Sequence, residues 1–153
     1  MQTTGLTIRV SVPEQRLDLL TGDKVLVSYP VSTSRFGLGP EAGSMKTPPG
    51  KFRIVEKIGA DVPLGTIFRS RVPLAPKDPP PPDDDLILTR ILWLDGIEDH
   101  NANTRDRFIY IHGTNHEAEI GRPASHGCIR MRSVDIADLF DRVPAGTEVV
   151  IAS

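Results

Sequence analysis

The sequence predicts a single, mostly-β domain with one amphipathic helix packed on it. Short segments in which apolar and polar residues alternate occur along most of the chain, and this alternation is typical of half-buried strands. Only one segment, near the C-terminus, has the periodicity of a helix. A chain of 153 residues fits one domain, residues 1–153, and can bury a core without disulfides or metals.

Four strands are expected in the first half of the chain. The first alternates Leu6, Ile8 and Val10 with polar residues. The second and third form a hairpin, because a Thr-Gly-Asp turn separates them. A Thr-Pro-Pro-Gly turn precedes the fourth. The four segments are residues 6–12, 15–20, 24–31 and 51–57.

Residues 61–85 are expected to be irregular. The prolines at 79–82 must be extended, and the aspartates that follow them are expected to lie in solvent. The segment is either a surface excursion or a lid over the functional site, since long loops are often functional.

Two strands and the helix are expected next. Residues 86–94 are too apolar for an exposed edge and predict a central strand. Residues 108–112 predict another strand, with Phe108, Tyr110 and His112 on one face.

The one helix follows from residue 133. Ser133 can cap it, Asp135 favours its positive end, and Pro144 ends it. Residues 148–151 close the chain as a strand. The helix presents an apolar stripe to the core, which consists of Ile136, Leu139, Phe140 and Val143.

Composition narrows the classes of partner. A net charge of −2 and a pI near 6.1 give no indication of a positively charged surface that would bind nucleic acid or an anionic membrane. No stretch reaches the roughly 18 apolar residues of a membrane span, and residues 1–20 lack the apolar core of a secretory signal. These observations favour a cytoplasmic protein, with the cell envelope as the alternative if a leader has been removed.

The only cysteine, Cys128, indicates a catalytic site. A thiolate is a strong nucleophile, and a histidine within hydrogen-bond distance can generate it. His112 ends a predicted strand 16 positions earlier, so a loop can bring the two side chains together. Gly127 allows a tight turn, so its amide and that of Cys128 could point at a developing oxyanion. A buried structural cysteine is the competing interpretation.

A zinc site is a second interpretation, because nitrogen and sulfur ligands suit zinc. His112 and His116 would have to lie on a helix to share one face, and the β pattern between them argues against that. We therefore expect no metal and no other cofactor. The residues that suggest the site are His112, His116, His126 and Cys128.

Arg130 follows Cys128 by two residues, so on an extended chain both side chains face the same way. Its guanidinium could clamp a substrate carboxylate through two parallel hydrogen bonds. The alternative is a surface ion pair with Asp135 or Asp138 of the helix.

Around these residues the sequence resembles the L,D-transpeptidase catalytic domain, or YkuD-like, family. The resemblance rests on His-Gly-Thr-Asn at 112–115 and on Ser-His-Gly-Cys-Ile-Arg-Met at 125–131. Other segments extend it over nearly the whole chain, namely residues 15–17, 31–34, 47–52 and 91–94.

The resemblance implies a β-sandwich with a helix near the site, and an acyl-enzyme made on a peptidoglycan stem peptide. Cys128 would attack the carbonyl of the third residue, often meso-diaminopimelate or lysine, and expel the terminal D-Ala. His112 would be the base and then the acid, oriented by the carbonyl of Gly113. The amides of Gly127 and Cys128 would form part of the oxyanion hole. Contacts with the substrate are expected from Tyr110, Ser125, His126 and Arg130.

The acyl-enzyme has two fates. An amine of a second stem gives a cross-link, whereas water gives an L,D-carboxypeptidase, which the missing leader makes a serious alternative. A non-catalytic wall-binding module and a zinc hydrolase are less favoured, because Cys128 and His112 are both intact. Stem peptides or muropeptides are the expected partners, and we expect a monomer.

Overall fold

The computed structural model of the chain describes residues 5–39, 41–74 and 86–152. These residues contain ten strands, one α-helix and three short 3-10 helices. The strands are β1 (Leu6–Ser11), β2 (Arg16–Thr21), β3 (Lys24–Pro30), β4 (Gly50–Ile58), β5 (Ile67–Arg69), β6 (Val72–Pro73), β7 (Ile87–Gly96), β8 (Tyr110–Thr114), β9 (Ile129–Met131) and β10 (Glu148–Ala152), and the helices are η1 (Asp99–Asn101), η2 (Arg105–Arg107), η3 (Glu117–Glu119) and α1 (Ser133–Arg142).

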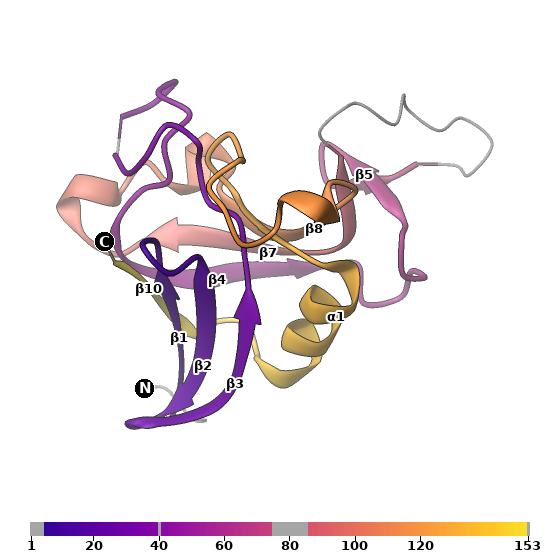
Figure 1. The fold of residues 1–153 in the computed structure, drawn as a ribbon, viewed down its shortest axis with the longest axis horizontal. Coiled ribbons are helices and arrows are strands. Elements are labelled where there is room, and N and C mark those ends of the chain that lie inside the picture. The colour runs from indigo at the N-terminus through magenta and orange to yellow at the C-terminus, as the bar shows by residue number, and fades with distance from the viewer. Residues whose placement is uncertain (1–4, 40, 75–85, 153) are drawn as a thin grey trace.

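The ten strands described form one mixed sheet. The order along its main path is β3-β2-β1-β10-β4-β7-β5-β6, while β8 pairs with β7 and β9 pairs with β8. Most neighbours are antiparallel, but β1 pairs with β10, and β8 with β9, in parallel. In Figure 1 the strands β1–β3 run across the direction of β4 and β7, so the sheet is strongly coiled.

The mostly-β single domain with one α-helix is thus confirmed for the part of the chain described here. The sandwich that the resemblance implies stays a prediction, because the strands belong to one hydrogen-bonded sheet. The four strands expected in the first half correspond to β1–β4, the central strand to β7 and the closing strand to β10.

Two expectations differ from the structure. The stretch expected to be irregular contains the β5–β6 hairpin, while residues 75–85, including the proline run of the suggested lid, lie outside the described residues. The strand expected at 108–112 begins only at Tyr110, because Phe108 is left-handed, with a φ of 56°, and cannot continue a strand. β9 has no sequence signal, because three residues are too few to show a period.

The helix begins at Ser133, but the Ser133 side chain does not cap it. The Ser133 N–H instead donates to Oε2 of Glu117, in η3, at 2.8 Å. A carboxylate from η3 therefore accepts a hydrogen bond from one of the unpaired N–H groups in the first turn of α1. It also places a negative charge at the positive end of the helix dipole. The predicted apolar stripe packs toward β7 and β8, and its members Ile136, Leu139, Phe140 and Val143 are all buried.

The core lies between the coiled sheet and α1. Its main cluster draws apolar side chains from β1, β2, β4, β7–β10 and α1. A smaller cluster contains Phe68, Ile91 and Tyr110, and Trp93 and Cys128 pack against it. The cysteine therefore lies where the small cluster meets the surface.

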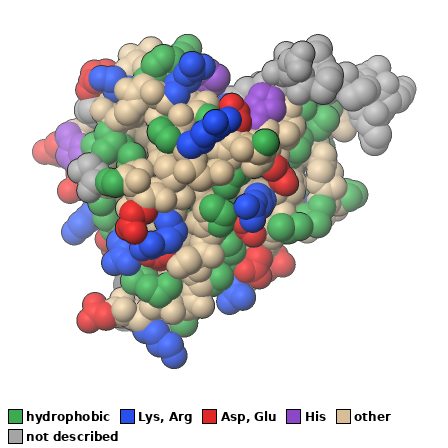
Figure 2. All heavy atoms as spheres, viewed as in Figure 1, with side chains coloured by type: hydrophobic (Ala, Val, Ile, Leu, Met, Phe, Trp, Pro, Cys, Tyr) green, Lys and Arg blue, Asp and Glu red, His purple; other side chains and the backbone are tan. Residues whose placement is uncertain are grey.

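The surface carries charges of both signs. Figure 2 shows Lys and Arg side chains interspersed with Asp and Glu on the face in view, in keeping with the net charge of −2. Among the residues that the structure describes, no helix has the length and apolarity needed to cross a bilayer.

Candidate active site

Cys128 directly precedes β9, which pairs in parallel with β8. Because Ile129 lies opposite Ile111, Cys128 lies beside Tyr110. The Tyr110 N–H donates to Cys128 Sγ at 3.4 Å, and the thiol donates to the Phe108 carbonyl oxygen at 3.4 Å. The cysteine is partly exposed, which suits a reactive thiol better than a structural one.

His112 is buried on β8, two residues after Tyr110. Side chains alternate along a strand, so the imidazole lies diagonally across from Cys128, and diagonal neighbours on adjacent strands are about 7–8 Å apart. His112 Nδ1 lies 2.6 Å from the carbonyl oxygen of Gly113. A carbonyl can only accept, so Nδ1 carries the hydrogen and Nε2 keeps the lone pair that can take a proton from a thiol.

Gly113 and an irregularity in β7 fix this arrangement. A Cβ at Gly113 would lie 2.6 Å from the Leu88 carbonyl oxygen and 3.3 Å from Ile136 Cγ2, so glycine is required between β7 and α1. Across from it, β7 pairs through Leu88 with Gly113 and through Ile91 with His112, so two residues of β7 bulge out between these pairs. Bulges beside functional sites re-aim side chains, and this one faces the imidazole-bearing part of β8.

The loop that carries Cys128 is held by the segment between β3 and β4. Thr47 Oγ1 donates to the Gly127 carbonyl at 2.9 Å and accepts from the Ser34 N–H at 2.9 Å. Ser34 and Ser125 also form a parallel bridge. The nucleophile therefore depends on residues about 80 positions earlier in the chain.

Ser125, expected to contact the substrate, is 1% exposed. Its Oγ donates to the Cys128 carbonyl at 2.6 Å and accepts from the Gly127 N–H at 3.3 Å. These two bonds shape the turn, for which Gly127 has a left-handed φ of 127°. They also engage one of the two amides expected in the oxyanion hole, whose formation by Gly127 and Cys128 stays a prediction.

A cation lies near the thiol. Arg107 donates to the carbonyls of Gly39 and Lys46 at 3.2 and 2.7 Å. Burial lowers the pKa of the Arg107 guanidinium, and the negative charges of Glu41 and Cys128 raise it. The pKa of the guanidinium is lowered overall, because burial is the largest of these effects.

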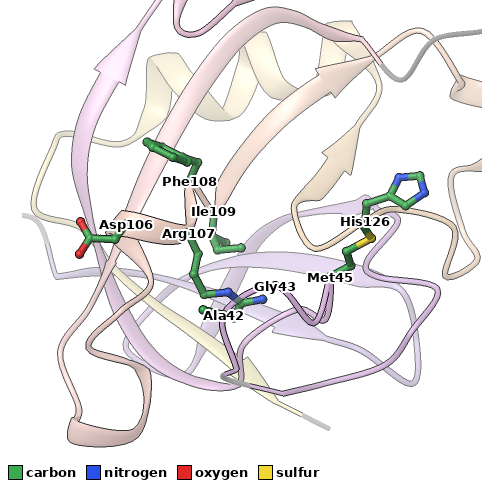
Figure 3. Close-up of a pocket in the computed structure, with 8 residues that line it drawn as sticks. All are labelled: Ala42, Gly43, Met45, Asp106, Arg107, Phe108, Ile109 and His126. Carbon is green, nitrogen blue, oxygen red and sulfur yellow. The ribbon is translucent and has the colours of Figure 1, made fainter.

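A pocket of about 280 Å³ is lined by Phe108 and His126 but not by Cys128 itself. Figure 3 shows Arg107 and Phe108 on one side of it, and Met45 and His126 close together on the other. His126 is exposed, which leaves it accessible to a substrate that enters the pocket. The pocket lies near the nucleophile through Phe108, whose carbonyl accepts the hydrogen bond of the Cys128 thiol.

Tyr110 borders the thiol on another side and is 4% exposed. Its ring meets that of Trp93 edge-on, with centroids 5.7 Å apart. Its hydroxyl accepts a hydrogen bond from Arg71 Nη1 at 2.9 Å. Burial raises the pKa of Tyr110, while the hydrogen bond and charge of Arg71 act against that rise. The phenol is thus held neutral at one edge of the site.

Arg130 lies opposite His112 in the β8–β9 pair, and its side chain is only 2% exposed. Its Nη1 donates to Glu119 Oε1 at 3.1 Å. The ion pair is therefore formed with η3 rather than with Asp135 or Asp138 of the helix. A carboxylate clamp at Arg130 stays a prediction, and the burial of the side chain favours a role in holding β9.

Replacement of Arg130 should cost stability. Arg130→Ala empties a buried site and leaves Glu119 without this partner, so we expect the free energy of unfolding to fall by about 2–5 kcal/mol. Urea unfolding followed by circular dichroism measures the loss. Arg132→Ala, which removes the same charge from an exposed position, should change the free energy of unfolding by less than about 0.5 kcal/mol. Equal midpoints for the two variants would contradict a structural role for Arg130.

The structure offers no support for a zinc site. In the described ranges, no three His, Cys, Asp or Glu side chains come together in a way that could hold a metal ion. His112 and His116 do not lie on a helix, since β8 ends at Thr114. His116 Nδ1 instead lies 3.4 Å from Glu119 Oε1.

Comparison with known families agrees with this geometry. The family model described as the L,D-transpeptidase catalytic domain (YkuD) matches residues 6–151. The chain belongs to this family. The putative L,D-transpeptidase YkuD of Bacillus subtilis is 29% identical over 144 residues, which are 94% of this chain and 64% of that protein. The probable L,D-transpeptidase YbiS of Escherichia coli K12 is 54% identical over 43 residues, 28% of this chain and 14% of that protein.

Solved L,D-transpeptidase structures share the fold. An L,D-transpeptidase from Mycobacterium smegmatis superposes with a TM-score of 0.62 at 16% identity, covering 97% of this chain and 59% of that one. The enzyme from Xylanimonas cellulosilytica gives 0.63 at 20% identity, covering 99% and 62%. This L,D-transpeptidase family chain therefore spans less than two thirds of the length of these relatives.

Several residues of the site carry no sequence signal. Arg71 and Arg107 lie in segments without a motif, and only the fold brings them near Cys128. Phe108 contributes its backbone carbonyl to the site, and a pattern of side chains cannot predict a backbone contact. Thr47 lies in a segment that resembles the family, yet its bond to Gly127 depends on tertiary contact.

Proposed function

We propose that this L,D-transpeptidase family chain transfers acyl groups of peptidoglycan stem tetrapeptides through a thioester on Cys128. One observation carries the proposal: a partly exposed thiol lies beside β8, on which a buried imidazole has its Nδ1 fixed by the Gly113 carbonyl. That arrangement suits a base whose Nε2 faces a nucleophile. The positive charge of Arg107 interacts electrostatically with the same thiol.

In the proposed acylation, His112 Nε2 takes the thiol proton and Cys128 Sγ attacks the carbonyl carbon of the third stem residue. The tetrahedral intermediate collapses with cleavage of the bond to the terminal D-Ala. His112 then gives its proton to the departing amine. In deacylation, water or the amine of a second stem attacks the thioester, and its proton returns to Cys128 through His112.

Hydrolysis by an L,D-carboxypeptidase route is the second candidate, and the exposure of the residues that line the pocket favours it when acceptor is scarce. Met45 and Phe108, which line the pocket, are 52% and 49% exposed, so water reaches the region next to the thiol. A stem amine must compete with that water, and a dilute acceptor competes poorly.

Incubation with a defined tetrapeptide, with and without an added stem amine, tests both candidates. We expect tripeptide and D-Ala without acceptor, and tripeptide still in excess over cross-linked dimer at modest acceptor concentration. Mass analysis of the products, and of the intact protein for an acyl adduct on the single cysteine, gives the readout. Mostly dimer would reject the carboxypeptidase route, and the absence of both products and adduct would reject acyl transfer on this class of peptide.

A further inference from the structure

Arg71 occupies the turn of the β5–β6 hairpin. Ser70 and Arg71 both have positive φ, 49° and 67°, as in the two-residue turns that fit the twist of a hairpin. β5 also pairs with β7, with Phe68 opposite Ile87. The hairpin is therefore anchored to the central sheet, and its turn has a defined position.

The guanidinium of Arg71 rests on three aromatic residues. Its Cζ lies 4.8 Å from the Trp93 ring centroid and 5.0 Å from the Phe108 ring centroid. Nη1 donates to the Tyr110 hydroxyl at 2.9 Å. A planar guanidinium held by stacking and by one hydrogen bond loses little further freedom when it binds a ligand.

The same aromatic residues surround the nucleophile. The Phe108 carbonyl accepts the Cys128 thiol hydrogen, and the Tyr110 N–H donates to Cys128 Sγ. Trp93 lies opposite Tyr110 in the β7–β8 pair, and both Trp93 and Cys128 pack against the apolar cluster that contains Tyr110. One side chain, that of Tyr110, thus separates the guanidinium of Arg71 from the thiol region.

Arg71, like Arg107, is held without an acidic partner among the described residues, but Arg107 donates to two carbonyls whereas Arg71 makes a single hydrogen bond, to Tyr110. Arg16 and Arg130 form ion pairs with Asp18 and Glu119. For Arg71, the described residues provide no carboxylate within ion-pair distance, and Tyr110 engages one of its five N–H groups. A partly buried cation that makes only one hydrogen bond is suited to a bidentate anion.

We propose that Arg71 binds a carboxylate of the donor substrate on one of the two residues that flank the bond attacked by Cys128. The identity of that donor as a stem peptide rests on the proposed function. Two carboxylates have this chemistry: the α-carboxylate of the terminal D-Ala and the side-chain carboxylate of a diaminopimelate at the third position. Arg71 is then a specificity-determining residue, and Arg130 holds the strand beside it.

The single cysteine allows a test that needs no peptide. Iodoacetate and iodoacetamide alkylate the same thiol and differ in one carboxylate, so the ratio of their rates measures carboxylate attraction at Cys128 alone. Arg71→Gln should lower the iodoacetate to iodoacetamide ratio about threefold or more. Arg69→Gln, which removes an equal charge from an exposed position of the same hairpin, should change the ratio by less than about twofold.

Peptide turnover distinguishes the two sources of carboxylate. kcat/KM for D-Ala release is measured with the free tetrapeptide, with the terminal carboxyl amidated, and with the diaminopimelate side-chain carboxyl amidated. Arg71→Gln should reduce kcat/KM for the free peptide roughly tenfold to a hundredfold. It should have little effect on whichever amidated peptide lacks the carboxylate that Arg71 binds.

Equal losses on all three peptides, with an unchanged alkylation ratio, would overturn the proposal and make Arg71 a support for the aromatic cluster. If the wild-type protein releases D-Ala from none of the peptides while the alkylation ratio still falls in Arg71→Gln, the proposed function fails and the carboxylate site stands. Thermal unfolding checks the fold of each variant. If Arg71→Gln unfolds at a lower temperature than the wild-type protein, Arg71→Lys replaces it in these tests. Lysine keeps the charge but lacks the planar guanidinium, so selectivity for the free peptide should still weaken. Unchanged selectivity in Arg71→Lys would count against the site.

Discussion

Cys128→Ala and Cys128→Ser should both abolish D-Ala release from stem tetrapeptides. No other thiol exists in the chain to carry the acyl group. A serine hydroxyl is far less acidic than a thiol, so it would need a stronger base than His112 with its Gly113 contact provides. Release of D-Ala is measured under single-turnover conditions, together with the mass of the protein to detect an adduct.

Both substitutions should leave the fold intact, because the side chain is partly exposed and its loss empties little of the core. The unfolding midpoint in urea is therefore the control. Appreciable turnover by a folded Cys128→Ala protein would exclude the covalent mechanism.

His112→Ala should slow acylation by about 10²–10⁴-fold, the usual contribution of a positioned proton-transfer group. The imidazole is held through Nδ1 by the Gly113 carbonyl, so Nε2 keeps the lone pair that a base needs. Rapid-quench measurement of acyl-protein formation isolates this step from deacylation.

His126→Ala is the matched control for the loss of an imidazole. His126 is exposed and lines the pocket, and its ring lies 6.1 Å from that of Phe36. We expect a smaller loss of acylation rate than for His112→Ala. The opposite ranking would show that His126, two residues before the nucleophile, is the base.

The parts of the fold that the sequence predicts are those with a local period. Strand β1 alternates buried Ile8 and Val10 with polar residues, and α1 repeats its buried positions with helical spacing. Where tertiary contacts determine the backbone conformation, the local sequence pattern does not predict it. Phe108 has strand-like composition but turns left-handed before β8, and the first turn of α1 is capped by Glu117 from another loop.

The candidate site divides in the same way. Cys128, His112 and Gly113 lie in two short motifs, and their chemistry can be read from residue types alone. Arg71 of the β5–β6 hairpin contacts Tyr110, which borders the thiol, and Arg107 lies in η2, so the roles of both depend on the folded chain. Arg130 shows that spacing along the sequence does not determine what a side chain contacts. It follows Cys128 by two residues, which suggested a contact with the substrate, but its guanidinium is buried and bonds to Glu119.

The position of β10 has a consequence for the order of assembly. β10 is the last strand to be synthesised, yet it lies between β1 and β4 and joins β3-β2-β1 to β4-β7. A nascent chain that has emerged only as far as α1 therefore presents two unpaired strand edges, which are templates for pairing with other chains. Contacts across the whole length of the chain also slow folding. We expect the two parts of the sheet to join only once β10 has been synthesised, so chaperones that shield strand edges would have most to protect before that point.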